Sequence, residues 1–286
     1  MPGKLYLVAT PIGNLEDITL RALECLRNAD VIACEDTRHS RILLEHYGIN
    51  ARTVSYHEHN KFDKAYALAA ELKAGKNIAL VTDAGTPGIS DPGEELVKVC
   101  MEQGIEVTSL PGASAVITAL SMCGLPSRRF VFEGFLPSEK KDRQKALGRL
   151  VNETRTIVIY EAPHHLRKTL KDLQDTLAER EIRICREITK IHETVMSCTI
   201  SEAIRFFETE EPRGEMVIVI SGADEEELAR KEIESFQELS VEEHMDRYLA
   251  EGMSEKDAMK AVASDRGISK REVYSMLKID SKQEEL

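Results

Sequence analysis

The sequence predicts two α/β domains followed by a small helical domain, and three observations lead to this architecture. Short β-rich runs alternate with helical patterns through the first half of the chain, as in βα units that build a largely parallel sheet covered on both faces. Cys123-Gly-Leu-Pro126 interrupts this pattern, and a second α/β block follows. Beyond residue 238 only helical segments are predicted. The expected domains are 1–124, 125–225 and 238–286.

The 286 residues have the composition of a soluble globular protein, with 42% hydrophobic and 31% charged residues. No apolar run approaches the length that crosses a bilayer, and the N-terminus lacks a signal-peptide pattern, so we expect a cytoplasmic protein without membrane contact. The formal charge of -12 argues against a general nucleic-acid coating protein but permits an RNA enzyme with a local basic cleft. The six cysteines show no metal-binding spacing and are predicted to be reduced thiols.

The first block is predicted from apolar runs with the length of buried strands and from the helical patterns between them. Strands are expected at 5–9, 31–34, 78–81 and 105–109, and helices at about 18–28, 38–47, 60–74, 92–103 and 113–122. Asp17 is well placed to cap the first helix. Asp91 is expected to cap the fourth, with Pro92 at its first position and Glu94 completing a capping box.

The second block shows the same alternation. Strands are expected at 130–133, 156–160, 182–185 and 216–220, with helices near 139–151, 163–178 and 200–208. The acidic run 221–227 closes this block and is typical of a solvated linker or a helix start.

Three capping pairs predict three short helices in the last part of the chain. The pairs are Ser240 with Glu243, Ser254 with Asp257, and Ser269 with Glu272. The turn at 266–269 between two of these helices resembles a helix-turn-helix. Packing of three helices without nucleic-acid contact explains the pattern nearly as well.

The loop Val81–Gly93 is much richer in glycine and proline than a plain connection between a strand and a helix needs. Such a loop presents bare backbone amides and the short side chains of Asp83 and Thr86 to a ligand at the carboxyl end of a strand. The loop therefore predicts a small-molecule site. Neither GxGxxG nor a P-loop pattern is present, which removes most of the support for dinucleotide binding and phosphoryl transfer.

Three further polar clusters follow predicted strands or open a helix: Glu35–Arg38, His57–Asn60 and Pro111–Ala115. Taken singly, they could be an ion pair, two histidines spaced by chance and a turn. The two histidines, without a third convincing ligand, are weak support for a metal, and none is predicted. Open α/β sheets bind ligands at the carboxyl edge, so the clusters together favour a ligand site there.

In order along the chain, these motifs resemble those of the tetrapyrrole methylase superfamily. The first half carries Thr10-Pro-Ile-Gly-Asn-Leu15, Glu35-Asp-Thr-Arg38, Asp83-Ala-Gly-Thr-Pro-Gly-Ile-Ser-Asp-Pro-Gly93 and Pro111-Gly-Ala-Ser114. The second half carries Phe130-Val-Phe-Glu-Gly-Phe-Leu-Pro137, Tyr160-Glu-Ala-Pro-His164, Arg186-Glu-Ile-Thr-Lys190 and Arg213-Gly-Glu215. Over essentially the whole chain they are similar to the branch that methylates small-subunit ribosomal RNA, the ribosomal RNA small subunit methyltransferase I type. That branch usually has an arginine where this chain has His165.

The resemblance implies two α/β domains of tetrapyrrole methylase type with the active site in the cleft between them, a bound S-adenosylmethionine, and a homodimer. The small C-terminal domain resembles the helical domain often appended to this branch. The residues expected to bind the cofactor are Ile12, Gly13, Asp83, Ala84, Gly85, Thr86, Ile89, Ser114, Ala115, Tyr160, Glu161 and Ala162.

For this branch the implied reaction is methylation of the ribose 2′-hydroxyl of a decoding-centre cytidine in 16S ribosomal RNA, free or in the assembled small subunit. A neutral hydroxyl is a poor nucleophile, so the site must orient it and help to remove its proton. Glu35, His57 and Glu187 are the candidate general bases. The candidate RNA-binding or orienting residues are Arg38, Lys141, Arg186 and Lys190.

Two other functions stay open on the sequence. The first is a corrinoid or diphthine methyltransferase of the same superfamily. The forms of the two loops at 10–14 and 83–87 and the helical tail count against it, because they resemble the RNA-methylating branch. The second is a non-catalytic nucleic-acid-binding regulator, suggested by the tail. The acidic overall charge counts against this regulator.

Overall fold

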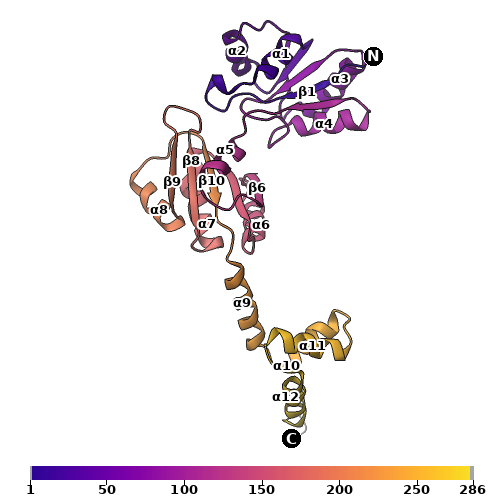
Figure 1. Ribbon diagram of the computed structural model, residues 1–286, viewed down its shortest axis with the longest axis vertical. Coiled ribbons are helices and arrows are strands. Elements are labelled where there is room, and N and C mark those ends of the chain that lie inside the picture. The colour runs from indigo at the N-terminus through magenta and orange to yellow at the C-terminus, as the bar shows by residue number, and fades with distance from the viewer. Residues whose placement is uncertain (1, 284–286) are drawn as a thin grey trace. The chain divides into compact units, whose positions relative to one another are not determined.

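The computed structural model describes residues 2–283, with the side chains of all but 232, 235, 237, 238 and 278–283. The chain forms two compact units, Met1–Gly222 and Ala223–Leu286. The first unit contains two five-stranded sheets and the second contains helices (Figure 1). The predicted boundaries at 124/125 and 225/238 stay predictions, although the two sheets lie on either side of the first of them.

The first sheet has the strand order β3-β2-β4-β1-β5, and every pairing in it is parallel. Its strands are β1 (Leu5–Val8), β2 (Val31–Cys34), β3 (Thr53–Ser55), β4 (Ile78–Val81) and β5 (Val107–Leu110). The predicted parallel sheet is therefore confirmed, with β3 as an additional edge strand. Because all five strands run the same way, the loops after them meet at one edge.

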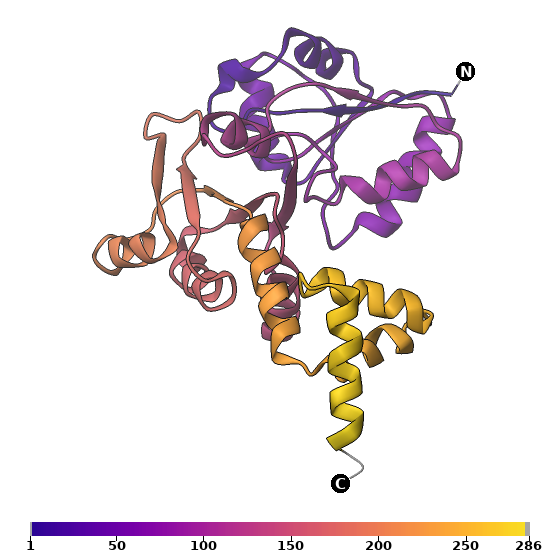
Figure 2. The same ribbon diagram turned by 60° about the horizontal axis from the view of Figure 1, so that its bottom comes forward.

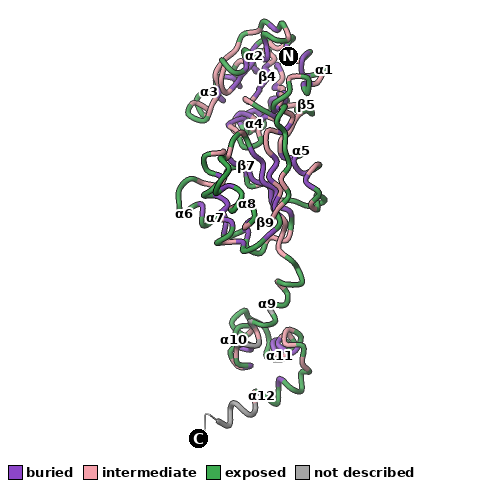
Figure 3. The backbone as a smooth tube through the Cα atoms, turned by 90° about the vertical axis from the view of Figure 1, so that its left-hand side faces the viewer, coloured by how far each residue is buried: buried purple, intermediate pink, exposed green. Residues whose placement is uncertain are grey.

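Helices cover both faces of this sheet, as predicted. On one face, leucines of α1 (Leu20–Asn28) and α2 (Thr37–His46) pack on the strands. On the other face, the sheet is covered by α3 (Lys61–Lys73) and α4 (Gly93–Glu102). All residues of β2 and β4 are buried, which explains why these strands are continuous apolar runs in the sequence (Figure 3).

Two predicted helix caps are wrong. Helix α1 is capped by the Thr19 hydroxyl, which accepts a hydrogen bond from the Ala22 amide at 3.1 Å, while Asp17 lies in a short 3-10 helix before it. At α4 the N-cap residue is Pro92, and no capping box with Glu94 forms. The Asp91 carboxylate instead accepts hydrogen bonds from amides on both sides of it.

The second sheet has the order β6-β7-β10-β8-β9. Its strands are β6 (Phe130–Phe135), β7 (Thr156–Glu161), β8 (Glu181–Arg186), β9 (Thr194–Thr199) and β10 (Met216–Ile220). Only the pairing of β6 with β7 is parallel, and the other three are antiparallel. The exposed edge strand β9 was not predicted.

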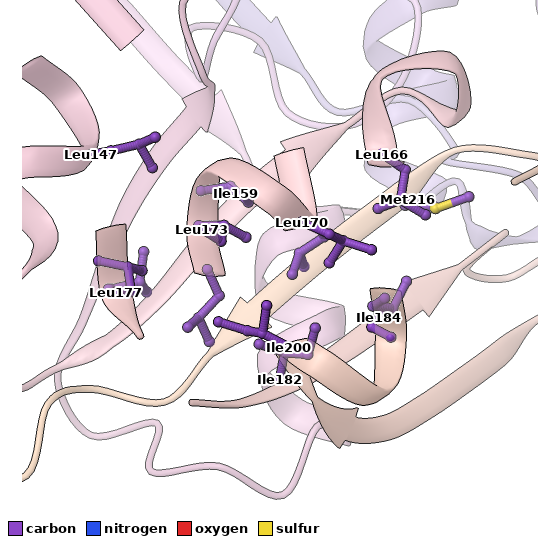
Figure 4. Packing of buried hydrophobic residues seen from close by; sticks show 14 of the residues in the cluster. Leu147, Ile159, Leu166, Leu170, Leu173, Leu177, Ile182, Ile184, Ile200 and Met216 are labelled. Carbon is purple, nitrogen blue, oxygen red and sulfur yellow. The ribbon is translucent and has the colours of Figure 1, made fainter. Parts of the chain in front are cut away.

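Helices α6 (Lys140–Leu150), α7 (Leu166–Leu177) and α8 (Ile200–Thr209) cover one face of this sheet. Their leucines and isoleucines interlock with those of the central strands (Figure 4). Helix α5 (Ala115–Met122) lies against the other face, where Val116, Ala119 and Leu120 pack with Val217 and Val219 of β10. Because α5 follows the last strand of the first sheet, its packing connects the two sheets within the first unit.

The second unit is helical (Figure 2). Its helices are α9 (Glu225–Glu238), α10 (Val241–Ala250), α11 (Glu255–Asp265) and α12 (Lys270–Gln283). The predicted capping pairs at Ser240, Ser254 and Ser269 are confirmed by hydrogen bonds from the third residue of each following helix. The acidic run that closes the second block is a helix start, because Asp224 caps α9. The last three residues of the predicted domain 238–286 lie outside the described residues.

Candidate active site

A cavity of about 490 Å³ lies within the first unit, between loops that follow the first sheet and one edge of the second sheet. From the first half it is lined by Ile12, Glu35, Thr82, Asp83, Ala84, Gly85, Thr86, Ile89, Ser90, Asp91, Ser114 and Ala115. From the second half it is lined by Phe135, Tyr160, Glu161, Ala162, Pro163, Ile188, Glu215, Met216 and Val217. Eleven of the twelve residues that the sequence suggests for the cofactor therefore line one cavity, and Gly13 does not.

Hydrogen bonds hold the glycine-rich loop after β4 in place. Gly85 exchanges two backbone hydrogen bonds with Thr10, at 2.9 and 3.0 Å, which ties this loop to the loop after β1. The Thr86 hydroxyl donates to the carbonyl of Ala113 at 3.0 Å, which ties it to the segment before α5. Gly85 has a φ of 87°, a conformation that favours glycine. Three loops of the first sheet thus form one continuous wall.

Asp91 fixes the far end of the same loop. Its Oδ2 accepts hydrogen bonds from the amides of Gly88 and Ile89, at 2.7 and 3.1 Å, and its Oδ1 accepts one from Gly93 at 2.7 Å. Ser90, between these amides, has a φ of 59°. This carboxylate therefore stabilises a strained turn that faces the cavity.

Glu35 is the one candidate base that lines the cavity, among the residues described. Its Oε2 accepts a hydrogen bond from the Thr82 hydroxyl at 3.3 Å. Burial raises the pKa of Glu35, and the nearby charge of Asp83 raises it further. A half-buried carboxylate with a raised pKa is suited to accept a proton.

His57 does not line the cavity. It follows β3, which is the edge strand, so the loop that carries it starts one strand further from the middle of the sheet than the loop of Glu35. Asn60 fixes this loop by accepting a hydrogen bond from the His57 amide at 2.9 Å. Within the described part of the chain, the buried Nδ1 of His57 has no hydrogen-bond partner.

Glu187 also lies outside the cavity lining, between Arg186 and the lining residue Ile188. Its Oε1 accepts hydrogen bonds from Lys190 Nζ and from the Glu215 amide, both at 3.0 Å. Burial acts to raise the pKa of Glu187, but these hydrogen bonds outweigh it and the pKa is lowered. A carboxylate held in its charged form by two donors is a poor proton acceptor at neutral pH.

The wall from the second sheet is mainly apolar. The Tyr160 ring packs against Phe132 and Phe135, with ring centroids 5.0 and 5.4 Å apart. Burial raises the pKa of Tyr160, so its hydroxyl stays protonated. Met216 and Val217 complete this wall.

Glu161, beside Tyr160, is buried and belongs to a polar network that also holds α6 and α7 together. It accepts hydrogen bonds from the Thr169 hydroxyl and, at 2.8 Å, from the Ala162 amide. Thr169 in turn accepts one from Arg143 Nη2 at 2.6 Å, and Arg143 pairs with Asp172 at 2.6 Å. Glu161 is thus fixed from behind the cavity wall.

None of the four candidate RNA-binding residues lines the cavity. Arg38 is exposed and paired with Asp36 at 2.7 Å, and Lys141 is exposed on α6. Arg186 donates a hydrogen bond to the Thr194 hydroxyl at 3.2 Å. Lys190 pairs with two carboxylates, those of Glu187 and Glu215.

Sequence reasoning missed nine lining residues: Thr82, Ser90, Asp91, Phe135, Pro163, Ile188, Glu215, Met216 and Val217. Six of them lie inside motifs that carry the family resemblance: Ser90, Asp91, Phe135, Pro163, Ile188 and Glu215. Those motifs were the available signal. Met216 and Val217 begin β10, and a strand start gives no such signal when ligand sites are expected after the carboxyl ends of strands.

The cavity is strongly acidic. Five carboxylate residues line it, Glu35, Asp83, Asp91, Glu161 and Glu215, and none of the lining residues described is a lysine, arginine or histidine. Over residues 2–283 no group of three or more histidine, cysteine or acidic side chains is arranged to hold a metal ion. No helix in that range is long and apolar enough to cross a membrane. The arrangement favours a small organic cation as ligand.

Comparisons with known proteins show the family of the chain. The sequence model of the family "Tetrapyrrole (Corrin/Porphyrin) Methylases" matches residues 4–204. The chain is 47% identical to "Ribosomal RNA small subunit methyltransferase I" of Synechocystis sp., over 96% of this chain and 97% of that protein. It is 46% identical to the protein of the same name from Bacillus subtilis, over 95% and 93%.

Among solved structures, the chain resembles a uroporphyrin-III C-methyl transferase from Thermus thermophilus complexed with S-adenyl homocysteine. The TM-score is 0.55 at 18% identity, over 76% of this chain and 97% of that one, a likeness of fold. The family model and the sequence identities show that the chain belongs to the tetrapyrrole methylase family and, within it, to the ribosomal RNA small subunit methyltransferase I group.

Proposed function

We propose that this protein transfers a methyl group from S-adenosylmethionine to the ribose 2′-oxygen of a cytidine in the decoding centre of 16S ribosomal RNA. The names of relatives at 46–47% identity support methylation of small-subunit ribosomal RNA. The Thermus neighbour is named as a methyl transferase in complex with S-adenyl homocysteine, which is the product left when S-adenosylmethionine has lost its methyl group. The ribose 2′-oxygen and the cytidine as targets go beyond what these names state.

The acidic cavity is the observation that carries the choice of methyl donor. S-adenosylmethionine bears a sulfonium and an ammonium group, and five carboxylates without a lining cation among the described residues suit such a ligand. A volume of about 490 Å³ is within the range of small-molecule sites. We assign the adenine to the apolar wall of Phe135, Tyr160 and Met216, and the methionine part to the polar loop at 82–86 and to Ser114.

The proposed donor supplies an electrophilic methyl group: as the ribose oxygen forms the new C–O bond, the C–S bond breaks and its electron pair stays on sulfur. The hydroxyl proton must leave in the same reaction. We assign Glu35 as its acceptor, because Glu35 lines the cavity and its pKa is raised by burial and by Asp83. Orientation of the hydroxyl supplies much of the remaining acceleration.

The RNA substrate requires positive charge outside the cavity. We propose Arg38, Lys141 and Arg186 for phosphate contacts, since all three lie outside the acidic lining and the first two are exposed. A requirement for a 2′-hydroxyl would also exclude DNA. The proposal includes a homodimer that is located in the cytoplasm. Light scattering of the purified protein would test the dimer by its molar mass.

Purified protein, labelled S-adenosylmethionine and three acceptors test the proposal. The acceptors are assembled small ribosomal subunits, free 16S ribosomal RNA and a precorrin. We expect label in a single 2′-O-methylcytidine of the RNA and none in the precorrin. Labelled precorrin would favour a corrinoid methyltransferase, and RNA binding without any methyl transfer would favour a non-catalytic regulator.

A further inference from the structure

Glu187, Lys190 and Glu215 form an ion cluster beside the cavity. The Nζ of Lys190 lies 3.0 Å from Glu187 Oε1 and 3.0 Å from Glu215 Oε2. The same Glu187 oxygen accepts a hydrogen bond from the Glu215 amide at 3.0 Å. Of the three residues only Glu215 lines the cavity. The cluster therefore connects an anchor outside the cavity to a residue of the cavity lining.

Around this cluster the backbone adopts positive φ angles, which are rare for residues other than glycine. Glu187 and Thr189 have φ values of 53° and 68°. Gly214 has a φ of 77°, and a Cβ there would lie 2.6 Å from Cδ of Glu187. A Cβ on Gly13, in a different part of the chain, would lie 2.5 Å from Cγ of Lys190. Strained residues persist where the surrounding structure fixes them, which is common at functional sites.

The exposure of the three side chains shows which one is free to meet a ligand. Glu187 is 22% exposed, Lys190 is 31% exposed and Glu215 is 78% exposed. Burial acts to lower the pKa of Lys190, but the two carboxylates outweigh it and the pKa is raised, so the ammonium keeps its charge. Lys190 thus cannot accept a proton at neutral pH. No hydrogen bond to Glu215 Oε1 is found among residues 2–283.

We propose that Lys190 is a positioning residue for methyl transfer. Anchored by Glu187, it fixes the Glu215 carboxylate so that its free Oε1 accepts a hydrogen bond from the target nucleotide. This inference rests on the proposed function. It gives Lys190 a different role from the phosphate contact that the sequence suggests, because both of its ion pairs are to carboxylates.

A double-mutant cycle separates the two roles. We would prepare Lys190→Met, Glu215→Gln and the double variant, and measure kcat and KM with small ribosomal subunits together with S-adenosylmethionine binding by calorimetry. Each single change should lower kcat/KM by about tenfold or more, as for one charge-assisted hydrogen bond. The double variant should lose no more than Glu215→Gln alone, because Lys190 acts through Glu215. Binding of S-adenosylmethionine by Lys190→Met should be unchanged, because Lys190 does not line the cavity.

Two exposed residues on helices of the first sheet serve as matched controls, Lys73→Met and Glu102→Gln, and both should retain the activity of the unchanged protein. A direct phosphate contact would instead give multiplicative losses in the double variant. It would also reduce the salt dependence of KM in Lys190→Met by about one in log–log slope. Either of these two results would overturn the inference. Full activity of Lys190→Met, or loss of S-adenosylmethionine binding in that variant, would overturn it as well. If the unchanged protein itself does not methylate small ribosomal subunits, the proposed function is overturned instead.

Discussion

A Cβ added to Gly13 would lie 2.5 Å from Cγ of Lys190, and 2.9 Å from the carbonyl oxygen of Ile188. The loop after β1 and the loop after β8 therefore meet without room for even a methyl group. Gly13 was expected to bind the cofactor, but it does not line the cavity. Its close approach sets how the two cavity walls, one from each sheet, face each other.

Gly13→Ala should destabilise the first unit by about 1–3 kcal/mol, as overpacking of a tight contact does. Part of the clash is with the backbone at Ile188, which cannot rotate away as a side chain can. Chemical denaturation followed by circular dichroism measures the loss. Gly148→Ala is the matched control: it lies in α6 with open space around a new Cβ and should stabilise by roughly 0.5–1 kcal/mol. Equal stability of the two variants would contradict the tight contact.

Glu35→Gln should remove most methyl transfer and yet raise stability at neutral pH. Burial and Asp83 raise the pKa of Glu35 in the folded protein, so its ionisation is unfavourable to folding. The penalty is absent below the ordinary glutamate pKa of about 4.3 and grows as the pH rises through the folded pKa.

The gain in melting temperature of Glu35→Gln over the unchanged protein should therefore be larger at pH 7 than at pH 4. Glu102→Gln, an exposed control, should show no such difference. Activity of the unchanged protein should rise with pH through the raised pKa, and the residual activity of Glu35→Gln should not. A Glu35→Gln variant with full activity would exclude Glu35 as the proton acceptor.

Arg143→Met should destabilise the second sheet and its helices by about 3–5 kcal/mol. Arg143 is buried and hydrogen-bonds to Asp172 and Thr169, and Thr169 donates to the buried Glu161. Removal of the guanidinium leaves Asp172 without its cation and the Thr169 hydroxyl without its donor. The midpoint of urea denaturation measures the change, with the exposed Lys145→Met on the same helix as a control. Similar midpoints for both variants would show that the network contributes little.

The second unit should lose stability as the pH falls below about 6.5, the ordinary histidine pKa. Burial, and then the charge of Arg266, lower the pKa of His244, although Asp265 opposes this. Arg266 Nε donates a hydrogen bond to His244 Nδ1 at 3.2 Å, which requires the neutral ring. A group with a lowered folded pKa stabilises the fold above its unfolded pKa and loses that contribution as the pH falls through the folded one.

Hydrogen exchange of α10 and α11, corrected for the intrinsic effect of pH, should show lower protection at pH 5.5 than at pH 7.5. His244→Gln should abolish the difference, and exchange of the first sheet serves as the internal reference. Protection that is independent of pH in the unchanged protein would contradict a role for the His244 ring.

The parallel sheet and its ligand edge could be predicted because all strands run the same way. Glu35, Asp83 and Ser114 follow β2, β4 and β5, so strand order alone gathers them at one edge. His57 follows the same rule, yet edge strand β3 keeps it out of the cavity lining. A single sequence does not reveal which strand lies at the edge.

The second sheet was harder to predict because most of its strands are antiparallel. The end of β7 and the start of β10 contribute to its cavity edge, so Glu215 precedes a strand and Met216 begins it, instead of following one. Strand β9 is exposed and rich in threonine and serine, without the apolar run that marks a buried strand. The ion pair between Lys190 and Glu215 joins residues 25 positions apart, a contact that local patterns do not encode.

The most direct test of the central claim is mass spectrometry of small-subunit ribosomal RNA from cells that lack this protein. We expect the loss of one 2′-O-methylcytidine from the decoding centre, restored by the unchanged protein and not by Glu35→Gln. An unchanged methylation map in those cells would contradict it.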